Sequence, residues 1–128
     1  VANTREDNGC QQEKERGEVC THQFINAYDV APDGTTSNGR LFAKMHSAED
    51  GVPDGMKVDL EGRVYCTGPE GVWIFDGQGD HLGIIRLPAI PANCAWGGPD
   101  NQTMFFTARH SIFTMRMKTP GTAIPRAT

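Results

Sequence analysis

Residues 53–75 read PDGMKVDLEGRVYCTGPEGVWIF, and residues 92–115 read ANCAWGGPDNQTMFFTARHSIFTM. The two stretches align with a spacing of about 40 positions. The matching pairs are Asp54 with Asn93, Tyr65 with Phe105, and Val72 with Ile112. In both stretches, short runs of β-branched and aromatic residues alternate with turns rich in glycine, proline and aspartate. A group of strands that recurs about every 40 residues is typical of a β-propeller blade.

The rest of the chain continues this pattern. Strands are expected over residues 24–30, 41–45, 56–60, 64–67, 72–75, 83–87, 104–107 and 112–117. No segment keeps a helical period over three turns. The sequence therefore predicts an all-β chain of about three four-stranded blades, which is an incomplete propeller. Because a blade cannot bury both faces alone, further blades or a partner chain are expected to close it. A small two-sheet sandwich is the second choice, since it does not require the repeat.

Composition narrows the classes of partner. The chain has 128 residues and a formal net charge of −4, which weighs against nucleic acid as a ligand. No apolar run approaches the roughly 20 residues of a membrane span, so no membrane insertion is expected. The first residues do not resemble a secretion signal. A cytoplasmic location is favoured, with a signal peptide upstream of Val1 as the open alternative. The chain begins without Met, in what reads as the end of a strand, and is therefore interpreted as a fragment.

Several segments are expected to be structural. Residues 5–18 are polar and charged and are predicted to form a mobile, exposed loop. Cys10 lies in this loop and Cys20 just after it, and the two could form a disulfide, whereas Cys66 and Cys94 are expected to be small buried side chains. Trp73 and Trp96 are expected in the core. The histidines His22, His46, His81 and His110 share no spacing that would select a catalytic base. The repeat region is assigned to residues 1–121 and an extended tail to residues 122–128.

Residues 51–59, together with Gly62, Tyr65, Thr67 and Gly71-Val72, resemble the core motif of the gluconolactonase/regucalcin family. Residues 82–85, 93–100 and 106–109 resemble the later segments of that family's sequence, so the resemblance runs from Val1 to about Gly121. It implies a six-bladed propeller with one divalent metal ion in the central channel. Ca²⁺ is the leading metal, with Zn²⁺, Mg²⁺ and Mn²⁺ as alternatives. The implied reaction is hydrolysis of sugar lactones to aldonic acids.

The resemblance also implies roles for individual residues. Asp54 corresponds to the family's aspartate ligand and would act as metal ligand and catalytic residue, since hard cations prefer oxygen donors. The family's other two ligands, a Glu and an Asn, would precede Val1, and Asn3 does not correspond to either. Asn93 holds the same repeat position as Asp54 and is expected to face the channel and bind substrate hydroxyls. The plain alternatives are a β-turn at Pro53–Gly55 and a local backbone bond by Asn93.

Three functions remain open on the sequence. The leading hypothesis is metal-dependent lactone hydrolysis by the complete propeller, to which this chain contributes the C-terminal part; alone it is expected to be nearly inactive. The alternatives are a non-catalytic propeller module that binds a ligand or partner, because propellers host many functions, and an inactive truncated product. Glu and Asn ligands encoded upstream of Val1 would favour the first.

Overall fold

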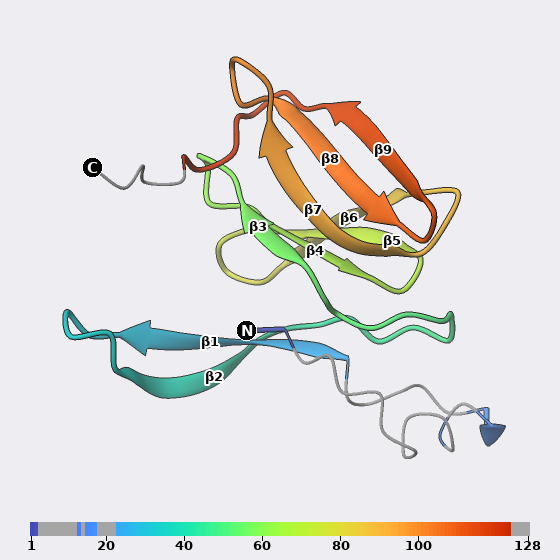
Figure 1. Cartoon of the computed structure of the whole chain (residues 1–128). Helices are drawn as coiled ribbons and strands as arrows, with labels where there is room; N and C mark the ends of the chain where they lie inside the picture. Colours follow the sequence, from blue (N-terminus) through green and yellow to red (C-terminus); the bar gives the residue numbers. More distant parts are fainter. Residues whose placement is uncertain (3–12, 14, 18–22, 124–128) are drawn as a thin grey trace.

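The computed structural model describes residues 1–2, 13, 15–17 and 23–123. Within this part of the chain nine strands form three antiparallel sheets (Figure 1). The strands are β1 (Phe24–Val30), β2 (Thr36–Lys44), β3 (Met56–Val58), β4 (Val64–Gly68), β5 (Gly71–Phe75), β6 (His81–Arg86), β7 (Pro91–Gly97), β8 (Thr103–Ala108) and β9 (Ser111–Arg116). The sheets are β1-β2, β3-β4-β5-β6 and β7-β8-β9, each in chain order. Glu13 and Glu15 are helical.

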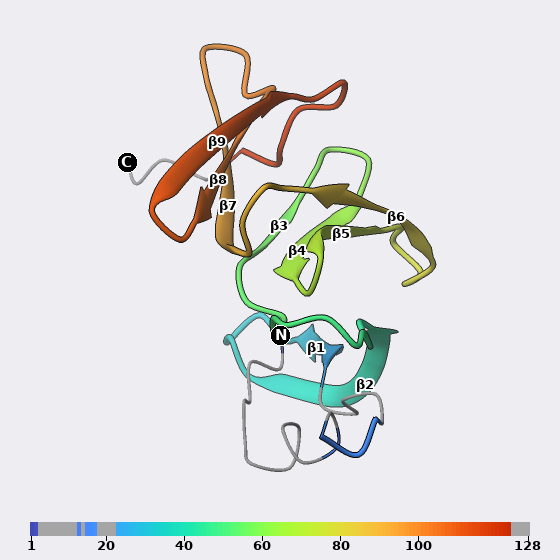
Figure 2. The same cartoon turned by 90° about the vertical axis from the view of Figure 1, so that its right-hand side faces the viewer.

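The four-stranded sheet lies between the other two (Figures 1 and 2). A separate core cluster packs on each of its faces. Toward the β1-β2 hairpin, Cys66, Trp73 and Phe75 pack with Ile25 and Met45. On the other face, the cluster consists of Tyr65, Val72, Cys94, Met104 and Phe106. This sheet-on-sheet order, with no helix between sheets, is the packing expected of consecutive propeller blades.

Burial on both faces explains why β4 reads as a continuous rather than alternating apolar run. Tyr65, Cys66 and Thr67 are all buried, with exposed fractions of at most 4%. The Tyr65 ring meets the Trp96 ring of β7 edge to face, with centroids 5.6 Å apart. Trp73 is buried, as predicted, and its indole N–H donates to the Pro69 carbonyl at 2.6 Å. Trp96 is half-buried against the second cluster.

The expected strands are all present, but several bounds differ. β3 ends at Val58 instead of residue 60, and β6 begins at His81 instead of residue 83. β2 begins at Thr36 instead of residue 41, because the polar residues Thr36–Arg40 pair with β1 through their backbone in an exposed hairpin. β7 runs from Pro91 to Gly97 and lies outside the expected strand ranges. Its alanines, asparagine and glycine have low β-propensity, and the neighbouring sheet overrides that preference. One sheet has the full four strands, and the others have three and two within the described residues.

The outer face of the last sheet carries exposed apolar side chains. Phe105 of β8 and Ile112 of β9 are 41% and 70% exposed. In a propeller such a face packs against the next blade. That further blades or a partner chain cover it remains a prediction.

Several expectations lie outside the described residues. These are the Cys10–Cys20 disulfide, His22, most of the loop over residues 5–18, and the tail beyond residue 123. The division at residue 121 also remains a prediction. In the part that is described, no helix has the length and hydrophobicity that crossing a bilayer requires.

The buried thiols predict a loss of stability in alkali. Burial raises the pKa of Cys66 from 9.0 to about 12 and that of Cys94 from 9.0 to about 11. Above about pH 9 the unfolded chain loses these protons while the folded chain keeps them, so stability falls as pH rises. The free energy of unfolding should fall by about 1–2 kcal/mol per thiol by pH 10.5. Urea denaturation under reducing conditions at pH 8 and pH 10.5 measures this change. Cys94→Ala should show a smaller fall than wild type; equal falls would contradict the assignment.

Candidate active site

Asp54 lies two residues before β3, in a segment that is bonded to β4. The Asp54 N–H donates to the Thr67 carbonyl at 3.0 Å, and the Thr67 N–H donates to the Gly55 carbonyl at 2.9 Å. These cross-strand bonds differ from the i to i+3 bond of a β-turn, so Pro53–Gly55 extends the strand. The Asp54 side chain is exposed. Burial raises the pKa of the Cys66 thiol, and Asp54 acts on it in two opposed ways: its backbone hydrogen bond lowers that pKa and its negative charge raises it.

Asn93 is the third residue of β7 and is also exposed. Its side-chain oxygen accepts the Cys94 N–H at 2.8 Å. The local backbone bond considered for this residue is therefore present. It orients the amide, and the substrate-binding role of Asn93 remains a prediction.

The strand register corrects the predicted equivalence of Asp54 and Asn93. Asn93 lies opposite Thr107 in its hairpin, whereas Gly55 takes the corresponding place opposite Thr67. Asn93 is thus equivalent to Gly55, one residue beyond Asp54. The reason is that the β7–β8 hairpin contains one more residue pair than the β3–β4 hairpin, although the two connections are equally long. Three pairs run from Met56–Cys66 to Val58–Val64, and four run from Cys94–Phe106 to Gly97–Thr103. An irregularity between Pro91 and Asn93 also shifts the register, and sequence spacing does not reveal it.

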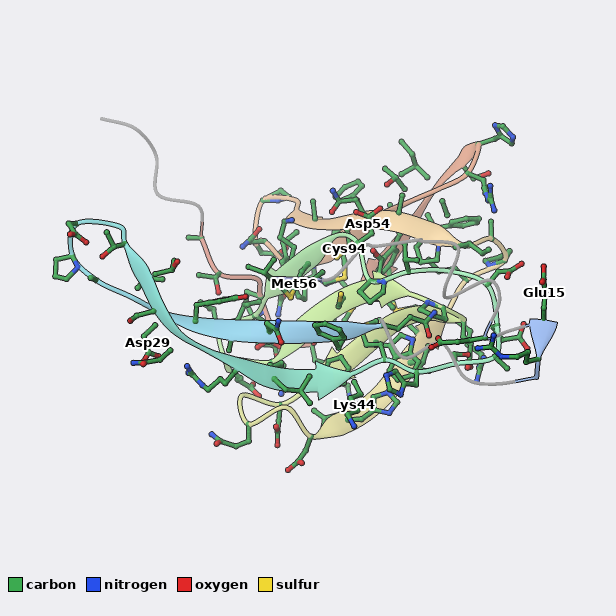
Figure 3. All side chains as sticks on the ribbon, turned by 90° about the horizontal axis from the view of Figure 1, so that it is seen from below. Glu15, Asp29, Lys44, Asp54, Met56 and Cys94 are labelled. Atoms are coloured by element: carbon green, nitrogen blue, oxygen red, sulfur yellow. The ribbon has the colours of Figure 1, made fainter. Side chains whose placement is uncertain are left out.

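The two candidate residues are nevertheless brought together through Gly55. The Gly55 N–H donates to the Ala92 carbonyl at 3.0 Å, so the segment that carries Asp54 is bonded to the strand that carries Asn93. A Cβ atom at Gly55 would lie 2.1 Å from Asn93 Oδ1 and 2.6 Å from Asn93 Cα. Only glycine allows this close approach. Figure 3 shows Asp54 where β3 and β7 meet, whereas Asp29 lies out on the β1-β2 hairpin.

The donor set suits part of a site for a hard cation. Asp54 offers a carboxylate and Asn93 an amide oxygen, the groups that Ca²⁺ and Mg²⁺ prefer. Within the described residues, no group of three His, Cys, Asp or Glu side chains could hold a metal ion. Such cations need about six to eight oxygen ligands. Asp54 therefore fits the role of one ligand among several that come from elsewhere.

The structure also contains a cleft and places two of the four histidines. A cleft of about 300 Å³ is lined by Glu49, Asp50, Glu70 and residues 87–90. The Ser47 hydroxyl donates a hydrogen bond to the Glu70 carboxylate, and Arg86 forms an ion pair with the same carboxylate. Both interactions hold the Glu70 pKa below its ordinary value. His81 stacks on Trp73. His110 is exposed in the β8–β9 turn.

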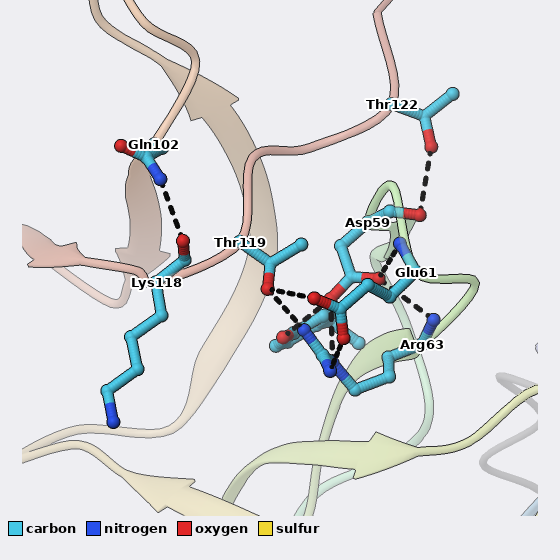
Figure 4. Close-up of polar contacts among 8 residues, drawn as sticks. Asp59, Glu61, Arg63, Gln102, Lys118, Thr119 and Thr122 are labelled. Atoms are coloured by element: carbon cyan, nitrogen blue, oxygen red, sulfur yellow. Dashed lines mark hydrogen bonds and ion pairs between the residues drawn. The ribbon is translucent and has the colours of Figure 1, made fainter.

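Sequence reasoning missed a polar network built around Asp59. Its buried carboxylate accepts the N–H groups of Glu61 and Arg63, the Arg63 Nε–H and the Tyr65 hydroxyl (Figure 4). Arg63 also donates to Thr119, and the Thr122 N–H donates to the Val58 carbonyl. The β3–β4 turn is thereby bonded to the chain that follows β9. The sequence signal for this network is the spacing of Asp59, Arg63 and Tyr65 within the motif from Gly51 to Val72.

Comparison with known proteins finds a matching family model and several relatives. The family model for the SMP-30/gluconolactonase/LRE-like region matches residues 19–110. The chain is 40% identical over 73 residues to a gluconolactonase of Zymomonas mobilis, covering 56% of this chain and 20% of that protein. It is 34% identical over 87 residues to regucalcin of Danio rerio, covering 65% of this chain and 29% of that protein. The chain thus spans less than a third of each of these curated relatives.

Solved structures agree on the fold. A gluconolactonase structure from Xanthomonas campestris matches with a TM-score of 0.61 and 31% identity, covering 77% of this chain and 30% of that one. The X-ray structure of another protein grouped with the gluconolactonases has a TM-score of 0.72 at 22% identity, covering 83% and 37%. The all-β propeller fold predicted from the repeat is confirmed. The chain belongs to the SMP-30/gluconolactonase/LRE-like family.

Proposed function

We propose that this chain is the C-terminal part of a propeller that hydrolyses sugar lactones with the help of a divalent metal ion. The relatives named gluconolactonase and lactonohydrolase support lactone hydrolysis as the reaction class. The observation that carries the proposal is the junction at Gly55, which brings an exposed carboxylate and an exposed amide to the same end of two neighbouring strands.

In the proposed reaction, water adds to the lactone carbonyl carbon and the ring C–O bond breaks. The ring oxygen takes up a proton, and an aldonic acid is formed. A bound divalent cation would polarise the carbonyl oxygen. Asp54 would hold that cation through its carboxylate and orient or deprotonate the attacking water. Asn93 would donate or accept a hydrogen bond with a substrate hydroxyl. Ca²⁺ is the proposed ion, with Zn²⁺, Mg²⁺ and Mn²⁺ as alternatives.

The described residues provide a minority of the ligands that a hard cation needs. We therefore propose that upstream blades supply the remainder and cover the open sheet faces. The 128-residue chain alone is expected to bind such a cation no better than millimolar, because a single carboxylate competes poorly with hydration.

The test compares the isolated chain with a completed propeller, defined as this chain with the upstream blades of a relative joined before Val1. Aldonolactone hydrolysis is followed in a pH-stat, with the spontaneous rate subtracted, after EDTA treatment and re-addition of each cation. The completed propeller should turn over with a restored cation, and the isolated chain should be slower by roughly a hundredfold or more. A folded completed propeller without turnover would overturn the proposal in favour of a binding module. Comparable turnover by the isolated chain would show that upstream blades are unnecessary.

A further inference from the structure

One buried hydroxyl joins the two strands of the candidate site. Thr67 of β4 has an exposed fraction of 0%. Its Oγ1 accepts the Gly55 N–H at 2.9 Å and lies 2.9 Å from the Ala92 carbonyl oxygen, to which it donates. The Gly55 carbonyl is a second acceptor at 3.3 Å. The hydroxyl therefore bonds to one residue in each of two neighbouring sheets.

These partners are the chain neighbours of the two candidate residues. Gly55 directly follows Asp54, and Ala92 directly precedes Asn93. The Thr67 backbone also accepts the Asp54 N–H at 3.0 Å. A valine would fill the same volume, but it would leave the Ala92 carbonyl without this donor and loosen the link between the sheets.

We propose that Thr67 is a positioning residue that holds Asp54 and Asn93 in register across the boundary between the middle and last sheets. The inference rests on the proposed function, because it takes Asp54 and Asn93 as the working residues. The close packing of Asn93 against Gly55 explains why the alignment of the two strands matters at this point. Asn93 presses against the Gly55 backbone so closely that no Cβ fits between them, so a small relative shift of the strands moves both side chains.

The repeat offers a comparison inside the same chain. Thr107 is the equivalent of Thr67, and its hydroxyl donates to the Asn93 carbonyl at 3.4 Å, as Thr67 does toward Gly55. Thr107 is exposed at the outer face of the last sheet. Thr67 therefore differs from Thr107 in that its hydroxyl also bonds to a residue of a neighbouring sheet.

The first experiment uses the 128-residue chain and needs no activity. Thr67→Val removes the hydroxyl at constant shape, and Thr67→Ser keeps it. Thr35→Val is the matched control, because it removes a hydroxyl bonded to Asp33 in the exposed β1–β2 turn. NMR should show that Thr67→Val speeds exchange of the Gly55 amide by about threefold, because this N–H loses the Thr67 hydroxyl but keeps its bond to the Ala92 carbonyl. The Asn93 side-chain amide signal should also shift. Thr67→Ser and Thr35→Val should leave both near wild type.

The second experiment uses the completed propeller. Thr67→Val should weaken Mn²⁺ binding to the metal-free protein and lower kcat for an aldonolactone by about tenfold each, with KM changed less. Thr67→Ser should restore both. If Thr67→Val does not fold, Thr67→Ala is compared with Thr67→Ser, since that pair differs only by the hydroxyl.

Two results would overturn the inference. One is a folded Thr67→Val protein whose Asn93 resonance, Mn²⁺ affinity and kcat match wild type. The other is equal damage by Thr67→Val and Thr67→Ser, which would assign the effect to packing of the methyl group. If the wild-type completed propeller neither binds Mn²⁺ nor turns over, the proposed function fails. The Gly55 and Asn93 measurements in the isolated chain then still decide whether Thr67 sets the register.

Discussion

Replacing Asp54 with alanine in the completed propeller should lower kcat/KM for an aldonolactone by roughly a hundredfold or more, as expected for loss of a direct metal ligand. The same change should weaken metal binding by a similar factor. Stability should change little, because the Asp54 side chain is exposed and exposed positions contribute little to folding. Measurements of kcat/KM, of Ca²⁺ and Mn²⁺ affinity by calorimetry, and of the thermal unfolding midpoint separate these effects.

Asp80→Asn is the matched control for this change. Asp80 is an exposed carboxylate in the β5–β6 turn, so its neutralisation tests the loss of one negative charge away from the site. It should leave both kcat/KM and metal affinity unchanged. If a folded Asp54→Ala protein hydrolyses the lactone at the wild-type rate, the assignment of Asp54 to the site is wrong. This result would leave the lactonase hypothesis itself untested.

Replacing Asp59 with alanine should have the largest effect on stability, a loss of about 3–5 kcal/mol. The Asp59 side chain is fully buried and accepts four hydrogen bonds. Its removal leaves two backbone N–H groups, the Tyr65 hydroxyl and the Arg63 Nε–H without this acceptor, and an unpaired polar group is costly when it is buried. Urea denaturation of the 128-residue chain measures the loss.

The effect should extend beyond the β3–β4 turn. Because Arg63 also bonds Thr119 and the chain after β9 pairs with Val58 and Leu60, amide exchange should rise at Thr119, Gly121 and Thr122 as well. Asp29→Ala is the control, since Asp29 forms an exposed pair with Arg40 in the hairpin, and surface pairs contribute little. Similar losses for the two variants would show that the buried network does not stabilise the fold.

Much of the fold could be predicted from local patterns in the sequence. The 40-residue spacing of the strand runs predicted stacked sheets, because a strand's residue types and its bounding turns are local properties. The motif from Gly51 to Gly71 likewise identified the family and located Asp54. The buried state of Cys66, Cys94 and Trp73 followed from their place inside apolar runs.

Other features depend on contacts between sheets, which local pattern does not encode. Sequence spacing matched Asn93 with Asp54, whereas the extra residue pair in the β7–β8 hairpin and the irregularity near Ala92 make Gly55 its true equivalent. Thr67 read as one more polar residue in a strand, and only the approach of β7 gives its hydroxyl a partner in the next sheet. The need for glycine at position 55 has the same origin, because the space there is filled by Asn93 from another sheet. By itself the sequence determined the strands, the repeat and the family; the tertiary structure decided the register between sheets, because that register depends on steric fit and hydrogen bonds between residues distant in the chain.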